Sequence, residues 1–312
     1  MGKSQDFYQK LKKLIYALAP MAGITDSAFR QICKDFGADV VYSEMASVTA
    51  LVYNPAKTLE MLKFSPKERP YVVQLFGSNP EHFAKAVKLV QEKIKPDGID
   101  INFGCPVPKV ARQKAGAELF KDLKLSKEVI KSVITNTTLP VSIKTRAKVG
   151  SIDILQFLKN VSDLDIKTIM IHGRTFAQGF SGPVDYKIIK KIRGYFPGII
   201  LANGGAIDRQ TAQDLLTKTG ADGLGIGQGA LGRPWIFKNI KNKNEKIKDK
   251  QEIFKVALEH AELAYKLKGR QGIIEMRKHL CWYTQGLPGA RKLREKLVKV
   301  ESLRDVRKIL VI

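Results

Sequence analysis

The sequence predicts an α/β protein with a (β/α)8 barrel, the TIM-barrel fold, followed by a small all-helical domain. Short β-rich runs alternate with amphipathic helical stretches from about residue 17 to 227, which is the pattern of parallel βα units. The region holds eight such runs, and eight repeats favour a closed barrel over a doubly wound sheet. The strand pattern stops at about residue 240, so we expect a barrel domain over 1–240 and a helical domain over 241–312.

Each expected strand is a short run rich in β-branched or other apolar residues. In chain order the strands are expected at 17–21, 40–44, 71–76, 98–102, 140–144, 168–172, 199–203 and 222–227. Apolar residues recur at three- and four-residue spacing in the segments between them, which predicts amphipathic helices. The clearest helical faces are Phe29, Ile32, Cys33 and Phe36 in 26–37, and Phe83, Val87, Val90 and Ile94 in 80–94.

After the barrel, a lysine- and asparagine-rich linker is expected over 238–250. The helix expected at 251–267 has an apolar stripe that is more typical of a packed core than of a cofactor contact. Its members are Phe254, Ala257, Leu258, Ala261, Ala264 and Tyr265. Further helices are expected near 271–285, 290–299 and 301–309, with the turn sequence GLPG at 286–289 between the first and the second.

The composition is that of a globular protein with a full core, since 44% of the 312 residues are hydrophobic and 27% are charged. No run approaches the roughly 18 apolar residues of a membrane span, and the first residues lack the features of a signal peptide. We therefore expect a cytoplasmic protein with no membrane partner. Cys33, Cys105 and Cys281 are too widely separated for a disulfide framework or a CxxC metal site, so redox chemistry would need an organic cofactor.

The chain is strongly basic, with 54 Lys and Arg against 30 Asp and Glu, a net charge of +24. Such a balance indicates a polyanionic partner, most often nucleic acid, because clustered cations displace counterions from phosphates. A solvated basic surface is the alternative. Residues 241–312 hold 19 Lys and Arg against 9 Asp and Glu, which makes the helical domain the favoured face for that partner.

Catalytic residues of such a barrel gather at the C-terminal ends of the strands and in the loops beyond them. This sequence places glycines and polar side chains there, and no metal site is expected among them. They are Pro20, Met21 and Ala22 after the first strand, Gln74 in the third, Asn102 and Cys105 after the fourth, Lys144 and Arg146 after the fifth, His172 and Arg174 after the sixth, Asn203, Gly204 and Gly205 after the seventh, and Gly227 and Gln228 after the eighth.

Three of these features have both a functional and a structural interpretation. The GxGxxG spacing at Gly227, Gly229 and Gly232 is a weak dinucleotide signal, and its place after the eighth strand favours a phosphate site over a plain tight turn. Lys144 could lie beside the N1 and O2 edge of a flavin, which becomes anionic on reduction, or could be a salt-bridged structural lysine. His172 could bond a flavin or a base edge, or could be a satisfied core residue.

Cys105 lies between Gly104 and Pro106 in a loop at the active end of the fourth strand. A free cysteine is most often a small buried hydrophobe, which suits Cys33 on its helical stripe and also Cys281. Cys105 has no such stripe, and a thiol with an ordinary pKa of about 8.5 can donate a proton as a general acid at neutral pH. We favour a catalytic role for Cys105 over a buried thiol, although no Cys/His pair that would make it a nucleophile can be identified.

Eight stretches cover nearly the whole chain in this order: LAPMAGITDSAFR, VVQLFGSNPEHFAKA, GIDINFGCPVPKV, PVSIKTR, IHGRT, ANGGA, GIGQGALGRPWIF and RKHLCWYTQGLPGARKLR. Together they resemble the tRNA-dihydrouridine synthase family, and most closely its bacterial B-type members. The resemblance implies an FMN-bound barrel with a C-terminal helical tRNA-binding domain. Such an enzyme reduces the C5=C6 bond of a uracil in tRNA, with NADPH as the usual electron source. We expect a monomer.

The resemblance also implies a role for each position. Cys105 resembles the family's proton donor to uracil C5, while reduced FMN delivers a hydride from N5 to C6. Asn102, Arg146 and Arg174 would help to seat the uracil and the flavin. The flavin would be lined by Pro20, Met21, Ala22, Gln74, Lys144 and His172, with Asn203, Gly204, Gly205, Gly227 and Gln228 toward its ribityl phosphate. A uridine must leave its stack to reach a barrel mouth, and a basic helical domain would hold the tRNA meanwhile.

Two positions depart from the family pattern. Gln228 stands where many relatives have Arg, which removes a cation near the phosphate, and Gly205 stands where a polar residue is common. Two other functions also stay open. One is an FMN-dependent barrel reductase that acts on a free pyrimidine or an enone and does not need the basic tail. The other is a non-catalytic RNA-binding module.

Overall fold

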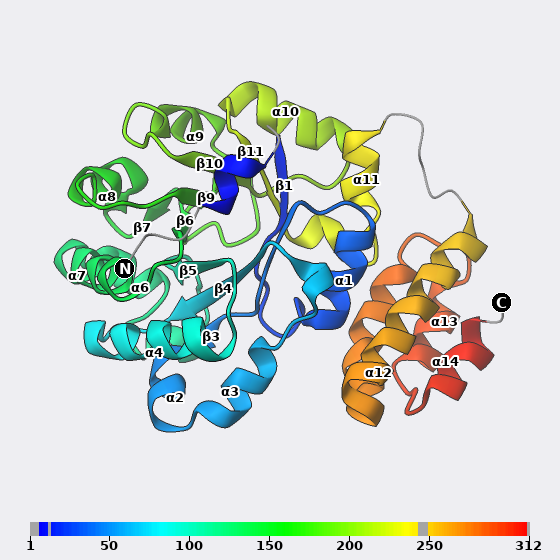
Figure 1. The fold of residues 1–312 in the computed structure, drawn as a ribbon. Coiled ribbons are helices and arrows are strands. Elements are labelled where there is room, and N and C mark those ends of the chain that lie inside the picture. Colours follow the sequence, from blue (N-terminus) through cyan, green and yellow to red (C-terminus); the bar gives the residue numbers. More distant parts are fainter. Residues whose placement is uncertain (1–5, 12–13, 243–248, 311–312) are drawn as a thin grey trace.

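The computed structural model describes residues 6–11, 14–242 and 249–310, and it has a (β/α)8 barrel with a helical region at one side (Figure 1). The barrel strands are parallel, and the pairing of β2 with β4 closes the ring. These strands are β1 (Ile15–Leu18), β2 (Val40–Tyr42), β4 (Tyr71–Phe76), β5 (Gly98–Asn102), β6 (Val141–Arg146), β9 (Thr168–His172), β10 (Ile199–Asn203) and β11 (Gly223–Ile226). The predicted fold class is confirmed.

Four strands have the predicted bounds, namely 71–76, 98–102, 168–172 and 199–203. The first strand was predicted too far along the chain: β1 ends at Leu18, because Pro20 has no backbone N–H to give to a neighbouring strand. Besides these eight strands, β3 (Ala46–Ser47) pairs in parallel with the end of β4, while β7 (Lys148–Val149) and β8 (Ile152–Asp153) form an antiparallel pair.

Helices cover the outside of the barrel, and several begin after an aspartate whose carboxylate accepts a backbone N–H of the first turn. The α-helices are α1 (Ser27–Asp35), α2 (Val48–Tyr53), α3 (Pro55–Leu62), α4 (Pro80–Lys93), α5 (Pro108–Ala111), α6 (Ala117–Lys121), α7 (Leu123–Asn136), α8 (Ile154–Asn160), α9 (Tyr186–Ile192), α10 (Arg209–Thr219) and α11 (Ile236–Lys241). Short 3-10 helices are η1 (Phe7–Lys10), η2 (Pro66–Glu68) and η3 (Gln228–Ala230). The apolar faces predicted in 26–37 and 80–94 are buried, except for Phe36 and Ile94, which are half-buried.

The barrel interior combines an apolar cluster with a few buried polar groups, among them Asp100, Ser142 and Thr168, and its polar side chains gather toward the C-terminal ends of the strands. The apolar part is a cluster of inward side chains contributed by the strands, among them Ala17, Val40, Val72, Met170 and Leu201. η1 covers this end of the barrel. Its Tyr8 is buried, and the Tyr8 hydroxyl lies 2.7 Å from the hydroxyl of Tyr42. The interior is therefore a packed core, and the polar end is the mouth.

The C-terminal helices are α12 (Lys250–Tyr283), α13 (Ala290–Leu297) and α14 (Leu303–Leu310). Gly269 interrupts α12 with φ 58° and ψ −141°, so its two halves correspond to the helices expected at 251–267 and 271–285. The expected linker was only partly right: 238–241 belong to α11, residue 250 starts α12, and 243–248 lie outside the described residues. None of the helices in the described ranges is long and apolar enough to span a membrane.

The helical region shares a hydrophobic core with the barrel. Ala28 and Ile32 of α1 and Trp235 pack in one cluster with apolar residues of α12 and α14. The expected stripe of α12 is buried at four positions, whereas Leu258 is half-buried and Tyr265, at its edge, is 47% exposed and was wrongly placed in the core. In Figure 1 the helical region accordingly lies directly beside α1.

Polar contacts fasten the same junction close to the first βα loop. Lys268 Nζ lies 2.8 Å from the carboxylate of Asp26, the N-cap of α1, and Lys278 donates a hydrogen bond to the carbonyl of Gly23. Burial has the largest single effect and raises the pKa of Asp26, but the charge and hydrogen bond of Lys268, the His260 ring and the Phe29 N–H together outweigh it and lower the pKa to about 2. The helical region is thus held beside the barrel mouth.

Candidate active site

The strand register brings the predicted polar residues side by side at the mouth. Asn102 of β5 pairs with Lys144 of β6, and Arg146 of β6 pairs with His172 of β9. His172 in turn pairs with Asn203 of β10. Because paired residues of neighbouring parallel strands point to the same side of a sheet, these five side chains form one arc around the barrel axis. We call this set the polar arc.

A chain of hydrogen bonds joins the barrel interior to the Cys105 loop. Gln74 Nε2 donates to Asp100 Oδ2 at 2.7 Å, and Asn102 Nδ2 donates to Gln74 Oε1 at 2.9 Å. Asn102 Oδ1 accepts the backbone N–H groups of Gly104 at 3.1 Å and Cys105 at 2.9 Å. The amides of Gln74 and Asn102 are therefore already committed to the protein.

The Cys105 thiol is half-buried at the end of this chain. Burial raises its pKa, against smaller opposing effects of the Val107 N–H and the positive charges of Lys144 and Arg146. The loop is closed from behind by Gly116, whose φ of +63° brings it against Cys105: a Cβ at Gly116 would lie 3.0 Å from the Cys105 carbonyl oxygen. The thiol is consequently protonated at neutral pH, and its loop is held in place at the end of β5.

The pKa values of Lys144 and His172 are both lowered by their surroundings. Burial, together with the charge of Arg146, lowers the pKa of Lys144 to about 8. Burial, together with the charges of Lys144, Arg146 and Arg174, lowers the pKa of His172 to about 3, so its imidazole is neutral at pH 7. Lys144 makes no hydrogen bond or ion pair with any residue that the structure describes. The interpretation of Lys144 as a salt-bridged structural lysine is therefore wrong.

The two arginines hold the loop that follows β9. Arg146 donates from Nη1 to the carbonyls of Thr175 and Gly179 at 3.1 and 2.8 Å, and from Nε to the carbonyl of Gly104 at 3.1 Å. Arg174 Nε donates to the Gly182 carbonyl at 2.8 Å. Arg146 thus connects this loop to the Cys105 loop, a role that the sequence did not indicate.

The loops after β10 and β11 contribute backbone rather than side chains. Gly204 and Gly205 have φ of +101° and +85°, and a Cβ at Gly204 would lie 2.4 Å from the His172 ring, so a glycine is required there. Within the described chain, the backbone N–H groups of Gly204, Gly205 and Gly227 donate no hydrogen bond. Asn203 Nδ2 donates to the Gly225 carbonyl, which fixes its side chain.

The other residues predicted near the phosphate differ in their surroundings. Gln228 is exposed at the start of η3. Of the GxGxxG glycines, Gly229 packs against the carbonyl oxygen of Ala206 and Gly232 against Trp282, so these two serve close packing. Only Gly227 of the three lies at the mouth, where a Cβ would be 3.4 Å from the sulfur of Met21. Pro20 and Met21 are half-buried and Ala22 is exposed, in the loop after β1.

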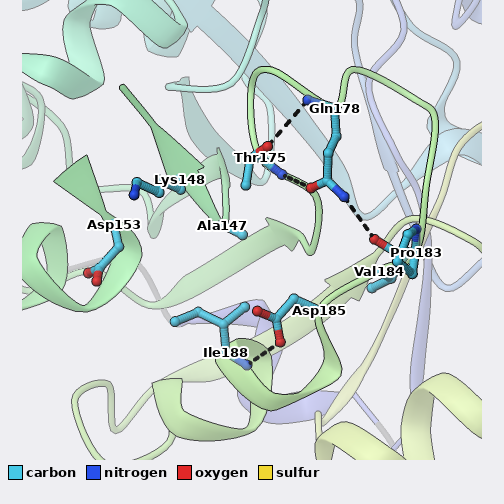
Figure 2. Close-up of a pocket in the computed structure, with 9 residues that line it drawn as sticks. All are labelled: Ala147, Lys148, Asp153, Thr175, Gln178, Pro183, Val184, Asp185 and Ile188. Atoms are coloured by element: carbon cyan, nitrogen blue, oxygen red, sulfur yellow. Dashed lines mark hydrogen bonds between the residues drawn. The ribbon is translucent and has the colours of Figure 1, made fainter. Parts of the chain in front are cut away.

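A separate cavity of about 500 Å³ opens between the loops that follow β6 and β9 (Figure 2). Its polar side chains are largely occupied by local bonds: Asp153 and Asp185 cap α8 and α9, and the Gln178 amide accepts the Thr175 N–H and donates to the Pro183 carbonyl. None of the predicted site residues lines this cavity. The polar arc, and not the cavity of Figure 2, is therefore the candidate active site.

The fold and this arc define the class of protein: a (β/α)8-barrel enzyme with a protonated thiol, an unpaired ammonium group and free backbone donors at its mouth. Solved structures with a similar fold include histamine dehydrogenase from Rhizobium sp. 4-9 (TM-score 0.58, 12% identity, 80% of this chain and 48% of that one). Another is the old yellow enzyme homologue from Zymomonas mobilis (TM-score 0.53, 15% identity, 76% of this chain and 90% of that one). At these identities the likeness concerns the fold alone.

Sequence comparison identifies the particular family. A profile described as "Dihydrouridine synthase (Dus)" matches residues 17–311. A probable tRNA-dihydrouridine synthase from Aquifex aeolicus is 33% identical over 95% of this chain and 94% of its own length. tRNA-dihydrouridine synthase B from Pseudomonas syringae pv. tomato is 34% identical over 91% of this chain and 87% of its own. The chain belongs to the dihydrouridine synthase family, a family of oxidoreductases, which confirms the resemblance seen in its motifs.

Proposed function

We propose that this protein reduces the C5=C6 bond of a uridine in tRNA, with FMN as its resident cofactor. The observation that carries the proposal is the half-buried Cys105 thiol, protonated and held at the mouth beside the polar arc. Membership of the dihydrouridine synthase family, with relatives named tRNA-dihydrouridine synthase over most of their length, supports the substrate class.

The residues at the mouth fit FMN. A phosphate ester is an anion, and the free N–H groups of Gly204, Gly205 and Gly227 are suitable donors for it. Lys144 feels the charge of the buried Asp100 but forms no ion pair with any described residue, which suits the edge of a flavin that gains negative charge on reduction. When bound and reduced, FMN would supply the hydride that uracil C6 receives.

The chain itself would deliver the proton. Cys105 Sγ–H would give its proton to uracil C5, which requires the thiol form that burial favours in the free protein. The resulting thiolate would be stabilised by the positive charges of Lys144 and Arg146, both of which favour the anionic form of Cys105. Arg174, beside His172, would help to seat the uracil, and Asn102 would do so by holding the Cys105 loop through its two accepted hydrogen bonds.

The remaining assignments complete the proposal. We propose that residues 1–240 are the catalytic domain and 241–312 the tRNA-binding domain, which the concentration of basic residues after 240 supports. NADPH is the proposed reductant, acting on a cytoplasmic monomer. The reductant follows from the family resemblance, and the location and the monomeric state are the expectations drawn from the sequence.

One experiment tests the reaction and its alternatives together. Unmodified tRNA transcript is incubated with the purified protein, FMN and NADPH, and dihydrouridine is mapped by mass spectrometry. A gain of two hydrogens at a defined uridine is the expected result. No gain, with bound flavin that an enone reoxidises, would instead indicate a small-molecule reductase. Protein that takes up no FMN would indicate an RNA-binding module.

A further inference from the structure

Asp100 of β5 is a buried carboxylate to which the reaction assigns no role. Its side chain is 0% exposed and points into the barrel below the polar arc. Oδ1 accepts the Ser142 hydroxyl at 2.7 Å, and Oδ2 accepts Gln74 Nε2 at 2.7 Å. Burial raises the pKa of Asp100 to about 6, against the lowering by these two hydrogen bonds and by the positive charge of Lys144, so the group is mainly ionised at pH 7.

We propose that Asp100 is a positioning residue that fixes the direction of the hydrogen bonds running through Gln74 and Asn102 to the Cys105 loop. The catalytic consequence of this inference rests on the proposed function, whereas its structural part concerns the protein without FMN or tRNA.

The groups at the two ends of this chain of hydrogen bonds determine the orientation of both amides. An ionised carboxylate only accepts, so it selects the nitrogen of the Gln74 amide and leaves the Gln74 oxygen facing Asn102. Asn102 must then present its nitrogen to Gln74 and its oxygen to the loop. The loop offers two backbone N–H groups, which only donate. Both ends of the chain therefore demand the same orientation of both amides.

The consequence falls on the loop that carries the thiol. With an apolar side chain at position 100, the Gln74 amide would lose the acceptor that orients it, and Asn102 would lose its anchor. The N–H groups of Gly104 and Cys105 would then be bound by an unsupported side chain. Arg146 and Gly116 would still contact the loop, so we expect loosening of the loop rather than unfolding.

The test is amide hydrogen exchange of Gly104 and Cys105 in the protein without FMN or tRNA. Asp100→Leu, close in size but apolar, should speed exchange at both amides roughly tenfold, the effect of one supporting hydrogen bond of typical strength. Asp100→Asn should stay close to the wild type, since its oxygen can accept from Gln74 and its nitrogen can donate to Ser142. Ser142→Ala is the matched control: it removes the other bond of Asp100 and should leave exchange at the loop unchanged.

A double variant tests the route. Asn102→Ala removes the acceptor of both N–H groups and should speed exchange at least as much, and adding Asp100→Leu to Asn102→Ala should produce no further change, because Asp100 acts through Asn102. Additive effects, or unchanged exchange in a folded Asp100→Leu protein, would overturn the proposal. If Asp100→Leu does not fold, Gln74→Leu breaks the chain at its next link, and the same outcomes apply to it.

The outcomes separate this inference from the proposed function. If the wild type forms no dihydrouridine while the variants change loop exchange as expected, the function is wrong and the positioning role stands. If dihydrouridine forms but loop exchange does not respond to Asp100→Leu, the function stands and the positioning role is wrong.

Discussion

At the residue scale, Cys105 allows binding and chemistry to be separated. Cys105→Ala should bind FMN like the wild type and slow uridine reduction about 10²–10⁴-fold, the usual contribution of a general acid. FMN binding is measured by absorbance titration and the rate by mass mapping of dihydrouridine. Cys281→Ala, at a half-buried thiol in α12, is the control and should keep the full rate. A normal rate in Cys105→Ala would remove the thiol from the mechanism.

Lys144 predicts how FMN affinity depends on pH. With a pKa of about 8 in the free protein, Lys144 is protonated below pH 8 and neutral above it. FMN is an anion overall, and its N1 and O2 edge accepts hydrogen bonds more strongly from an ammonium than from a neutral amine, so binding above pH 8 must take up a proton, and affinity should fall by up to tenfold per pH unit. Fluorescence titrations between pH 7 and 9.5 measure this.

Two variants decide whether Lys144 is the group responsible. Lys144→Met should bind FMN more weakly at pH 7 and lose the fall above pH 8. Lys148 is an exposed lysine two residues after the end of β6, and Lys148→Met should keep the wild-type pH profile. A fall that persists in Lys144→Met would assign the titration to another group.

The sequence predicted which residues lie at the mouth better than it predicted what they contact. Strand ends meet at one rim of a barrel by topology, so Asn102, Lys144 and His172 could be placed from their positions alone. Asp100 could not, because its role depends on which side chains face it across β4 and β6. Its one signal was a charged residue between Ile99 and Ile101. The carbonyl contacts of Arg146 depend on loop conformation, which residue spacing does not predict.

At the scale of elements, the N-terminus of α1 connects barrel and helical region. Asp26 both caps α1 and pairs with Lys268 of α12, so two substitutions separate these roles. Asp26→Asn keeps a good cap and loses the charge, whereas Asp26→Ala loses both. We expect Asp26→Ala to lower the free energy of unfolding by about 1 kcal/mol more than Asp26→Asn does. Urea unfolding of both variants measures the difference.

The same pair predicts a pH dependence of stability. The folded-state pKa of Asp26, about 2, lies below its ordinary value of 3.8, so its contribution is fully present above pH 4 and lost as the pH falls toward 2. The free energy of unfolding of Asp26→Asn should therefore fall less steeply than that of the wild type between pH 4 and 2. Parallel curves would mean that the pair adds nothing to stability.

Element prediction succeeded where apolar runs and helix breakers are local. The buried strands of the barrel read as continuous β-rich runs, and GLPG marked the turn between α12 and α13. The exposure of Tyr265 was not foreseen, since the apolar stripe shows that α12 has a packed face but not where that face ends. The contact with Ala28 and Ile32 joins segments far apart in sequence.

At the scale of the whole molecule, the basic helical region predicts how tRNA binding depends on salt. If α13 contacts phosphates, affinity should fall steeply with salt, with a log–log slope of about −0.7 to −0.9 for each phosphate contacted. Replacing the exposed Arg291, Lys292 and Arg294 of α13 by Gln should weaken binding and make the slope shallower. Filter binding at several salt concentrations measures both.

The matched control uses three lysines that are also exposed but lie on the barrel. Lys187, Lys190 and Lys191 lie in α9, on the side of the barrel away from the helical region (Figure 1). Their replacement by Gln should leave the slope nearly unchanged. Equal losses in the two triple variants would mean that net charge, and not the helical region, governs binding. Truncation is a poorer test, because it would expose Ala28 and Ile32.

Because η1 covers the N-terminal end of the barrel, it affects the order in which the two substrates can bind. With Tyr8 packed against Tyr42, a flavin bound in the mouth would be reached by other molecules from that side alone. An electron donor and a tRNA would have to occupy the same entrance in succession. Each catalytic cycle would then consist of two separate binding events, first of the electron donor and then of the tRNA. The protein would hold the electrons between the departure of the donor and the arrival of the tRNA.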